Sequence, residues 1–221
     1  MIALVLAGGD LTPNARLRHL AKEASLVIAA DSGLTHASAL GVSPDLIVGD
    51  FDSVTPQDLQ RYPNTPHSRH PTQKNDLDLE LAAKEALNLG ASHLRLMGVI
   101  GSRLDQSLGG LLIAARLHKE RVPTTVHTID TDVHFISQNE SLRPTRPAGT
   151  LFSVLSLSPK SAISIRGANY PLDNHLLAFG VGQGISNLST SGLEVHVKEG
   201  LVALLLQDDS LATEVVKNNS S

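Results

Sequence analysis

The chain has no cysteine and no tryptophan, and aromatic residues account for only 3% of its 221 positions. The absence of cysteine excludes disulfide bonds, thiol nucleophiles and thiolate metal ligands, and it fits a protein of the reducing cytoplasm. With so few aromatic rings the core must be aliphatic. A hydrophobic share of 41% is sufficient for such a core.

Long apolar runs and an excess of positive charge are also missing. No stretch approaches the roughly 20 apolar residues that a membrane-spanning helix needs. The apolar opening segment 2–6 lacks the basic residues of a signal peptide. The formal net charge of −4 gives no reason to expect a basic surface for nucleic acid. We therefore expect a soluble cytoplasmic protein that binds neither nucleic acid nor a membrane.

The first two-thirds of the chain alternates short apolar runs with segments of helical periodicity. Leu104, Leu108, Leu111, Leu112 and Ala115 follow the spacing of one helix face. Alternating strands and helices predict the α/β class, with a mostly parallel sheet covered by helices. In such sheets ligands bind beyond the carboxyl ends of the strands. The expected strands are 2–6, 26–30, 46–48, 94–98 and 124–129.

The pattern changes in the segment 139–149, where prolines and a glycine interrupt the chain. After it, short apolar runs separated by glycine-containing turns predict a small antiparallel β domain. We place the boundary between residues 144 and 145, which gives an α/β domain over 1–144 and a β domain over 145–221. The strands expected in the second domain are 151–157, 162–166, 176–179, 193–197 and 201–206.

Acidic residues follow the predicted strands or open the predicted helices. Asp50 and Asp52 stand one residue apart, so their charges repel unless a cation lies between them. Because the carboxyl ends of parallel strands meet at one edge of the sheet, we expect the acids to converge there. The candidates are Asp31, Asp50, Asp52, Asp76, Asp78 and Asp105.

Two interpretations of these acids are open. Each acid alone fits the first turn of a helix, where the helix dipole favours a negative charge by about 0.3–1 kcal/mol. Thr55 and Asn75 are matching N-cap candidates. Taken together, carboxylates at several strand ends of one edge favour a hard-cation site, because oxygen ligands suit Mg²⁺.

Glycines follow two of the same strands, in LAGGD, which contains Gly8 and Gly9, and in GVIGSR. Glycine lets backbone N–H groups approach a phosphate closely, and Arg103 adds a donor suited to phosphate. The sequence contains no Walker motif, no G-x-G-x-x-G and no G-x-S-x-G. Gly109 and Gly110 interrupt an expected helix at about 1 kcal/mol each, so we expect close packing to require both.

Four motifs in this order and spacing resemble the thiamine pyrophosphokinase (thiamine diphosphokinase) family: AADSG, GDFDS, NDLDLELA and GSRLDQ. The later segments RGANYPLDNHLLAFGVGQGISN and LEVHVKEGLVALLL are similar to that family's thiamine-binding domain. The resemblance covers nearly the whole chain. It implies an α/β domain followed by an antiparallel β-sandwich, in a homodimer whose active sites are shared between subunits.

The resemblance also implies an activity. This is the transfer of a diphosphoryl group from ATP to the hydroxyl of thiamine with Mg²⁺, giving thiamine diphosphate and AMP. By position, Asp50, Asp52, Asp76 and Asp105 would be the catalytic carboxylates that hold metal and phosphate. The nucleotide side would be lined by Gly8, Gly9, Asp31, Ser53, Arg103 and Gln106, and the thiamine side by Gln73, Ser186 and Asn187.

Two other functions stay open on the sequence. The absence of tryptophan leaves no obvious aromatic residue to pack on thiamine, which allows a diphosphokinase acting on another hydroxymethyl heterocycle, such as a pterin. Gln73, Asn75 and Ser102 depart from the family pattern and would suit a non-catalytic relative that binds a nucleotide or another ligand.

Overall fold

The computed structural model describes residues 1–70 and 77–208. The chain divides into two compact units, Met1–Ile129 and the residues from Asp130 onward. The sequence placed this boundary later, between residues 144 and 145. The difference comes from β7 (Thr131–Ser137), which pairs with β13 (Leu201–Gln207) along its whole length and therefore belongs to the second unit.

The first unit contains a parallel sheet in the order β6-β5-β1-β2-β3-β4. Its central strands are continuous aliphatic runs, as a sheet covered on both faces requires. The predicted strands of this part are confirmed, and β4 is an edge strand that the sequence did not predict. The bounds are β1 (Ile2–Leu6), β2 (Leu26–Ala30), β3 (Leu46–Gly49), β4 (His67–Arg69), β5 (His93–Met97) and β6 (Thr124–His127).

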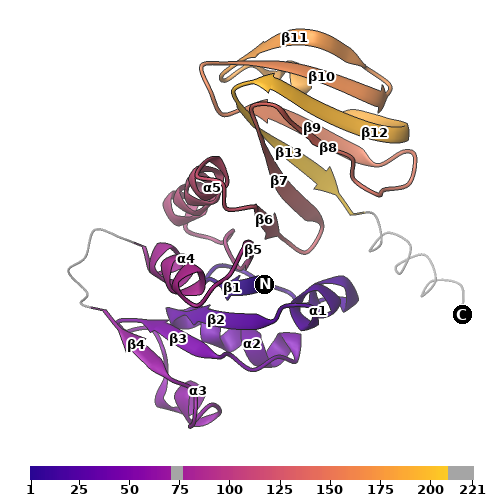
Figure 1. The fold of residues 1–221 in the computed structure, drawn as a ribbon. Helices are drawn as coiled ribbons and strands as arrows, with labels where there is room; N and C mark the ends of the chain where they lie inside the picture. The colour runs from indigo at the N-terminus through magenta and orange to yellow at the C-terminus, as the bar shows by residue number, and fades with distance from the viewer. Residues whose placement is uncertain (71–76, 209–221) are drawn as a thin grey trace, which may run out of the picture. The chain divides into compact units, whose positions relative to one another are not determined.

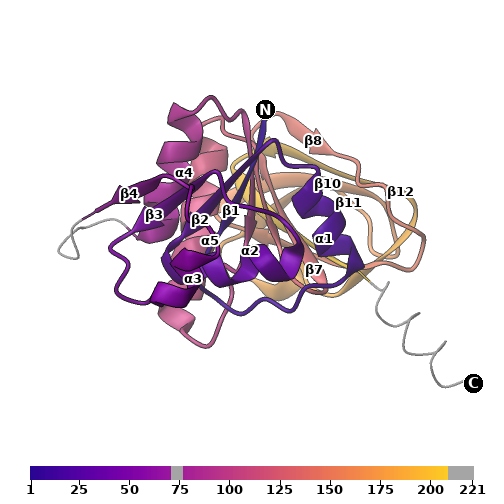
Figure 2. The ribbon, with the colours of Figure 1, turned by 90° about the horizontal axis from the view of Figure 1, so that it is seen from below.

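Helices cover both faces of this sheet. Figure 1 shows α4 and α5 on one side and α1 and α2 on the other, and in Figure 2, seen from below, α1 and α2 lie in front. Leu17 and Leu40 from the latter pair pack on Leu4 and Leu6 of β1 in an aliphatic core, as predicted. The bounds are α1 (Ala15–Lys22), the 3₁₀ turn η1 (Asp31–Gly33), α2 (Leu34–Leu40), α3 (Pro56–Gln60), α4 (Asp78–Asn88) and α5 (Leu104–Lys119).

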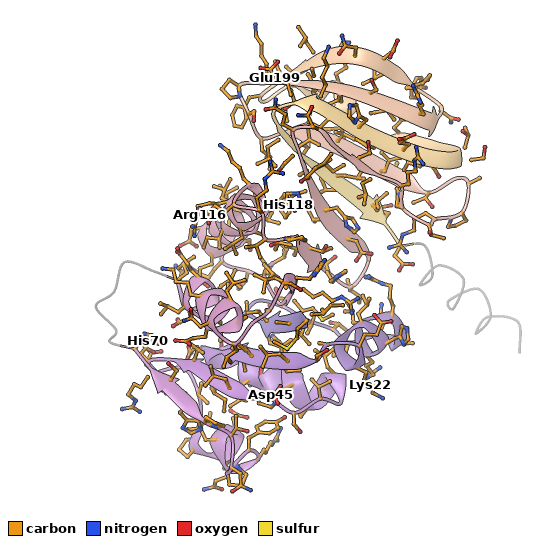
Figure 3. All side chains as sticks on the ribbon, in the orientation of Figure 1. Lys22, Asp45, His70, Arg116, His118 and Glu199 are labelled. Atoms are coloured by element: carbon orange, nitrogen blue, oxygen red, sulfur yellow. The ribbon has the colours of Figure 1, made fainter. Side chains whose placement is uncertain are left out.

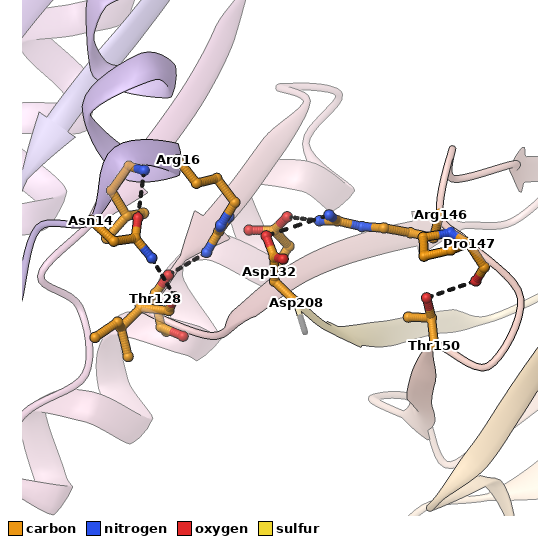
Figure 4. A network of polar contacts seen from close by, with 10 residues as sticks. Asn14, Arg16, Thr128, Asp132, Arg146, Pro147, Thr150 and Asp208 are labelled. Atoms are coloured by element: carbon orange, nitrogen blue, oxygen red, sulfur yellow. Dashed lines mark hydrogen bonds and ion pairs between the residues drawn. The ribbon is translucent and has the colours of Figure 1, made fainter. Parts of the chain in front are cut away.

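Side-chain caps fix where two of these helices begin. The Asn14 carboxamide accepts from the Leu17 backbone N–H at 2.8 Å and donates to the Ile129 carbonyl at 2.9 Å, which ties the start of α1 to the segment after β6 (Figure 4). Arg16 adds a bond of 2.6 Å to the Thr128 carbonyl. Thr55 forms a capping box with Asp58 at the start of α3. None of the described helices is both long enough and apolar enough to cross a bilayer.

The second unit is an antiparallel β-sandwich, which confirms the predicted fold class. One layer is β7-β13-β9 with the start of β12, and the other is β8-β12-β10-β11. Strand β12 contributes to both, and aliphatic side chains from both layers form the core between them. The remaining bounds are β8 (Glu140–Leu142), β9 (Leu151–Ser156), β10 (Lys160–Ala168), β11 (Leu172–Ala178), the 3₁₀ turn η2 (Gly182–Gly184) and β12 (Asn187–Glu199).

One arginine holds the loop before β9 in place. Arg146 forms ion pairs with the carboxylates of Asp132 and Asp208, whose side chains are almost completely buried (Figure 4). Next to it, the Thr150 hydroxyl donates to the Pro147 carbonyl at 2.8 Å. The segment that looked like a domain linker in the sequence is therefore an ordered part of the second unit.

Helix α5 is confirmed, but the leucines that reveal its period are mostly exposed. Leu104, Leu108 and Leu112 are 80%, 56% and 54% exposed. The helix packs instead through small residues, among them Ser107 and Gly110. This is where close approach decides the residue type, because a Cβ at Gly110 would lie 2.6 Å from Val99 Cγ1.

The neighbouring Gly109 is not required in the same way, which corrects the expectation from the sequence. The nearest atom to a Cβ at Gly109 would be Leu77 Cδ1 at 3.5 Å, an ordinary contact. We expect Gly109→Ala to raise the free energy of unfolding by up to about 1 kcal/mol through helix propensity. We expect Gly110→Ala to lower it by about 1–3 kcal/mol through overpacking. Urea denaturation of the two variants checks the pair, and equal effects would contradict it.

Candidate active site

A cavity of about 480 Å³ lies in the first unit, where β1, β2, β3 and β5 end. This is the edge at which an open parallel sheet binds its ligand. Many of the residues singled out in the sequence line it together: Gly8, Gly9, Asp31, Asp50, Asp52, Ser53, Arg103 and Gln106. Residues from distant parts of the sequence therefore meet at one place.

Three carboxylates form a compact group on the wall of this cavity. One oxygen each from Asp31, Asp50 and Asp52 lies within 4.8 Å of the other two. Asp31 is only 9% exposed, and its Oδ2 accepts a hydrogen bond from the Ser53 hydroxyl. Its Oδ1 is buried and has no hydrogen-bond partner among the described residues. A buried carboxylate oxygen without a partner is costly, and a bound cation would satisfy it.

The backbone adopts unfavourable angles to bring these carboxylates together. Asp31 has a φ of +47° and Phe51, between Asp50 and Asp52, has a φ of +67°. Residues other than glycine in this left-handed region cost about 1–3 kcal/mol each, and such angles gather at functional sites. The turn at Phe51 lets both neighbouring carboxylates face the same cavity, with the Asp52 N–H donating to Asp50 Oδ1 at 3.1 Å.

Charge repulsion is visible at Asp52. The pKa of Asp52 is raised from its ordinary value, chiefly by the negative charge of Asp50 and by its hydrogen bond with that residue. Partial desolvation adds to the effect, as do the charges of Asp31 and Asp78. The carboxylates therefore destabilise one another when no cation compensates them.

Asp78, one of the acids expected at this edge, belongs to this site, although the resemblance assigned the catalytic role to Asp76. Asp78 is the first residue of α4 and lines the cavity. The sequence does contain an indication of this role. Asp78 follows Asp76 by two residues in NDLDLELA and directly precedes Leu79, the first buried residue of α4. Gln73, Asn75 and Asp76 lie outside the described residues, so their predicted roles stay predictions.

Asp105 lies apart from the three clustered carboxylates. It is an exposed residue in the first turn of α5 and makes a two-pronged ion pair with Arg103, at 2.9 Å from Nε and 2.6 Å from Nη2. The hydrogen bond from Arg103 lowers the pKa of Asp105 to about 2. Asp105 does not line the cavity, whereas Arg103 does. In this geometry Asp105 orients the guanidinium at the cavity wall.

The loops around the cavity pack backbone against backbone. The Gly9 N–H donates to the Gly98 carbonyl at 2.7 Å, and a Cβ at Gly9 would lie 2.5 Å from that oxygen. The Ser107 hydroxyl accepts from the Gly101 N–H at 2.9 Å, which fixes the turn that leads into α5. The positive end of the α5 helix dipole favours anions, so this wall suits phosphate oxygens next to the carboxylates.

Two of the three residues predicted for thiamine, Ser186 and Asn187, lie in the second unit and differ in character. Asn187 is 6% exposed, and its side chain is used in hydrogen bonds to the backbone of Tyr170 and Leu188. Ser186 is exposed, has a φ of +60°, and is held by a bond from its N–H to Ser153 Oγ at 3.1 Å. Ser186 is therefore free to present its hydroxyl group, and Asn187 supports the turn beneath it.

Comparison with known families covers both units. The sequence model described as the thiamin pyrophosphokinase catalytic domain matches residues 17–126. The model of the thiamin pyrophosphokinase vitamin B1 binding domain matches residues 127–202. The chain belongs to the thiamin pyrophosphokinase family. The resemblance seen in the motifs is thereby confirmed.

Individual members of the family agree with this assignment. A thiamine pyrophosphokinase of Bacillus subtilis (strain 168) is 27% identical over 198 residues, which are 83% of this chain and 87% of that protein. The crystal structure of the Bacillus subtilis thiamine pyrophosphokinase matches with a TM-score of 0.82 at 22% identity, over 95% of this chain and 100% of that chain. The yeast thiamin pyrophosphokinase structure matches with a TM-score of 0.77 at 14% identity, over 93% and 86% of the two chains. The chain therefore has the two-domain fold of thiamin pyrophosphokinases.

Removal of one charge from the acidic group should stabilise the metal-free protein. Because the folded-state pKa of Asp52 is raised, its ionised form opposes folding above that pKa, and the opposition disappears below the ordinary value near 3.8. We expect Asp52→Asn to raise the Tm in EDTA at pH 7, and the gain to shrink as the pH falls toward 3.8. Thermal melting over this pH range is the measurement. The exposed Asp173→Asn in β11 is the control and should leave the Tm unchanged.

The contrast between Asn187 and Ser186 gives a second test. Asn187→Ala removes the side-chain partner of partly buried backbone groups of Tyr170 and Leu188, so we expect a loss of about 1–3 kcal/mol in unfolding free energy. Ser186→Ala should leave stability intact and raise the KM for thiamine. Melting curves and thiamine kinetics separate the two effects. An Asn187→Ala variant with wild-type stability and a raised KM for thiamine would contradict the supporting role. It would instead indicate the direct thiamine contact that the resemblance implies.

Proposed function

We propose that this protein is a thiamine diphosphokinase, which transfers a diphosphoryl group from ATP to the hydroxyl of thiamine and yields thiamine diphosphate and AMP. The observation that carries the proposal is the group of Asp31, Asp50 and Asp52 in a glycine-lined cavity, inside the part of the chain that matches the family's catalytic domain. A polyphosphate with a divalent cation is the ligand that such a wall suits.

The residues present fit Mg²⁺. The donors are all carboxylate oxygens, and the buried Asp31 Oδ1 lacks a partner among the described residues. Asp31, Asp50 and Asp52 would hold the ion, with Asp78 adding negative charge to the same wall. Held there, Mg²⁺ would supply positive charge to offset the negative charge of the phosphate groups.

The protein's own contribution to the transfer is alignment and charge compensation. The thiamine hydroxyl oxygen bonds to the β-phosphorus, the bond from that phosphorus to the oxygen shared with the α-phosphate breaks, and AMP leaves as the hydroxyl proton is released. Arg103, which lines the cavity, is placed to stabilise phosphate oxygens during this step. The close backbone packing of the loops at Gly9 and Gly98 would hold this wall in place for the phosphates.

The second unit is proposed to receive thiamine, because it matches the family's vitamin B1 binding domain. Ser186 is the residue on which we place the contact, with Asn187 as its support. We also propose a cytoplasmic location, in keeping with a chain that has no cysteine.

A direct assay tests the function. Purified protein with Mg²⁺ and ATP is given thiamine, a hydroxymethylpterin, or no acceptor, and AMP and the diphosphorylated product are measured. We expect AMP release only with thiamine. AMP release with the pterin and not with thiamine would identify a pterin as the acceptor. No AMP release with any acceptor would favour a protein that binds ligands without catalysis.

Arg103 and Asp105 provide a paired prediction on this reaction. We expect Arg103→Ala to lower kcat/KM for ATP by about 10²-fold, the effect of removing one donor to a developing negative charge. Arg103→Lys should recover little of the lost activity, because lysine cannot form the two-pronged contact that Arg103 makes with Asp105. Asp105→Asn should act in the same direction through Arg103, with unchanged Mg²⁺ affinity. A large loss of Mg²⁺ affinity in Asp105→Asn would assign Asp105 to the metal, as the resemblance implied.

We further propose that the protein acts as a homodimer. The stripe of Leu104, Leu108 and Leu112 supports this, because three exposed leucines in line on one helix are unusual on a monomer surface. Leu108→Glu should shift the protein toward the monomer in light scattering at micromolar concentration. Leu89→Glu, at the exposed C-cap residue that follows α4, is the matched control and should not. A monomeric wild-type protein would remove this proposal.

A further inference from the structure

An aromatic residue, Phe51, lies between Asp50 and Asp52 in the sequence. Phe51 packs against the aliphatic cluster of Ala29, Leu34, Ile47 and Val54. Its ring centroid lies 5.3 Å from that of His67, and the Arg69 guanidinium carbon lies 5.4 Å from the same centroid. The ring is therefore in contact with the core and with both side chains.

The edge strand β4 brings those two side chains into place. His67 pairs with Ile47 and Arg69 with Gly49 in the parallel ladder between β3 and β4. Since they are two residues apart, they project on the same side of the strand. The His70 N–H donates to the Gly49 carbonyl at 2.9 Å, so the register is held up to the residue just before Asp50. Figure 3 labels His70 at this end of β4.

These contacts explain how a bulky residue tolerates the backbone angle of the turn. A φ of +67° is unfavourable for an aromatic residue, and the adjacent carboxylates repel each other. Both effects push the turn toward an extended form. The packing of the ring opposes them, as does the hydrogen bond from the Asp52 N–H to Asp50 Oδ1. A cation–π contact at an exposed site contributes about 0.5–1 kcal/mol to this packing.

We propose that Phe51, with its ring held by Arg69 and His67, is a positioning residue that keeps the carboxylates of Asp50 and Asp52 together for a divalent cation. The inference rests on the proposed function for the identity of that cation. On this proposal β4 contributes to the cation site through Arg69 and His67, although β4 does not line the cavity.

A cation-binding measurement separates this role from a general electrostatic one. If Arg69 acted only through its charge, its removal would strengthen the binding of a cation nearby or leave it unchanged. If Arg69 holds the ring, Arg69→Ala should weaken binding by roughly two- to five-fold, as a contact of that size implies. The two explanations thus differ in sign.

The experiment measures Mn²⁺ binding by electron paramagnetic resonance in the absence and presence of ATP, with thermal melting to establish folding. Phe51→Leu should weaken Mn²⁺ binding by about ten-fold or more, and Phe51→Tyr and Arg69→Lys should keep most of the affinity. Arg61→Ala is the matched control, because this nearby arginine contacts the Ser38 hydroxyl and not the ring. It should bind Mn²⁺ like the wild-type protein.

Equal or tighter Mn²⁺ binding in folded Arg69→Ala and Phe51→Leu would overturn the proposal, as would a wild-type protein that binds no Mn²⁺ under either condition. Failure of the proposed function looks different. In that case the wild-type protein binds Mn²⁺ and the variants weaken it in the stated order, but no thiamine-dependent AMP appears.

Discussion

The mutual repulsion of Asp31, Asp50 and Asp52 is the constraint on which the rest of the first unit depends. Three negative charges within a few ångströms separate unless the chain holds them or a cation compensates them. Three features of the chain hold them together: the ends of adjacent parallel strands, the left-handed backbone conformation of Asp31 and Phe51, and the packing of the Phe51 ring. The aliphatic clusters that pack on this sheet provide the stability that offsets the cost of the arrangement.

Much of this could be predicted because it follows from short-range patterns. Aliphatic runs at regular intervals identify buried parallel strands, and an acid directly after such a run must lie at the ligand edge. Asp31, Asp50 and Asp52 satisfy this rule. Asp105 and Asp78 show the limit of this rule, because each lies in the first turn of a helix. There the rotation of the helix about its axis determines which side chain faces the cavity. The pairing of Asp105 with Arg103 depends on a rotamer that sequence spacing does not determine.

Other features could not be predicted because their causes are distant in the sequence. Strand β7 was assigned to the first domain, since nothing near Thr131 indicates that its partner is Gln207. Edge strand β4 has an exposed, polar sequence and lacks a periodic signal. In α5 the leucine period was correct, but period alone does not tell a buried face from an exposed one. The contact of Gly110 with Val99 decides the buried face, and it appears only in three dimensions.

Strand β12 has a consequence for how the second unit comes apart. Its first residues pair with β9 and the rest with β8 and β10, so one continuous stretch of backbone is shared by both layers. Neither layer can separate without breaking hydrogen bonds that also belong to the other. The sandwich should therefore open as a single cooperative block, with amide protons of both layers exchanging with solvent at similar rates. Thiamine bound to any part of this block would slow exchange throughout it.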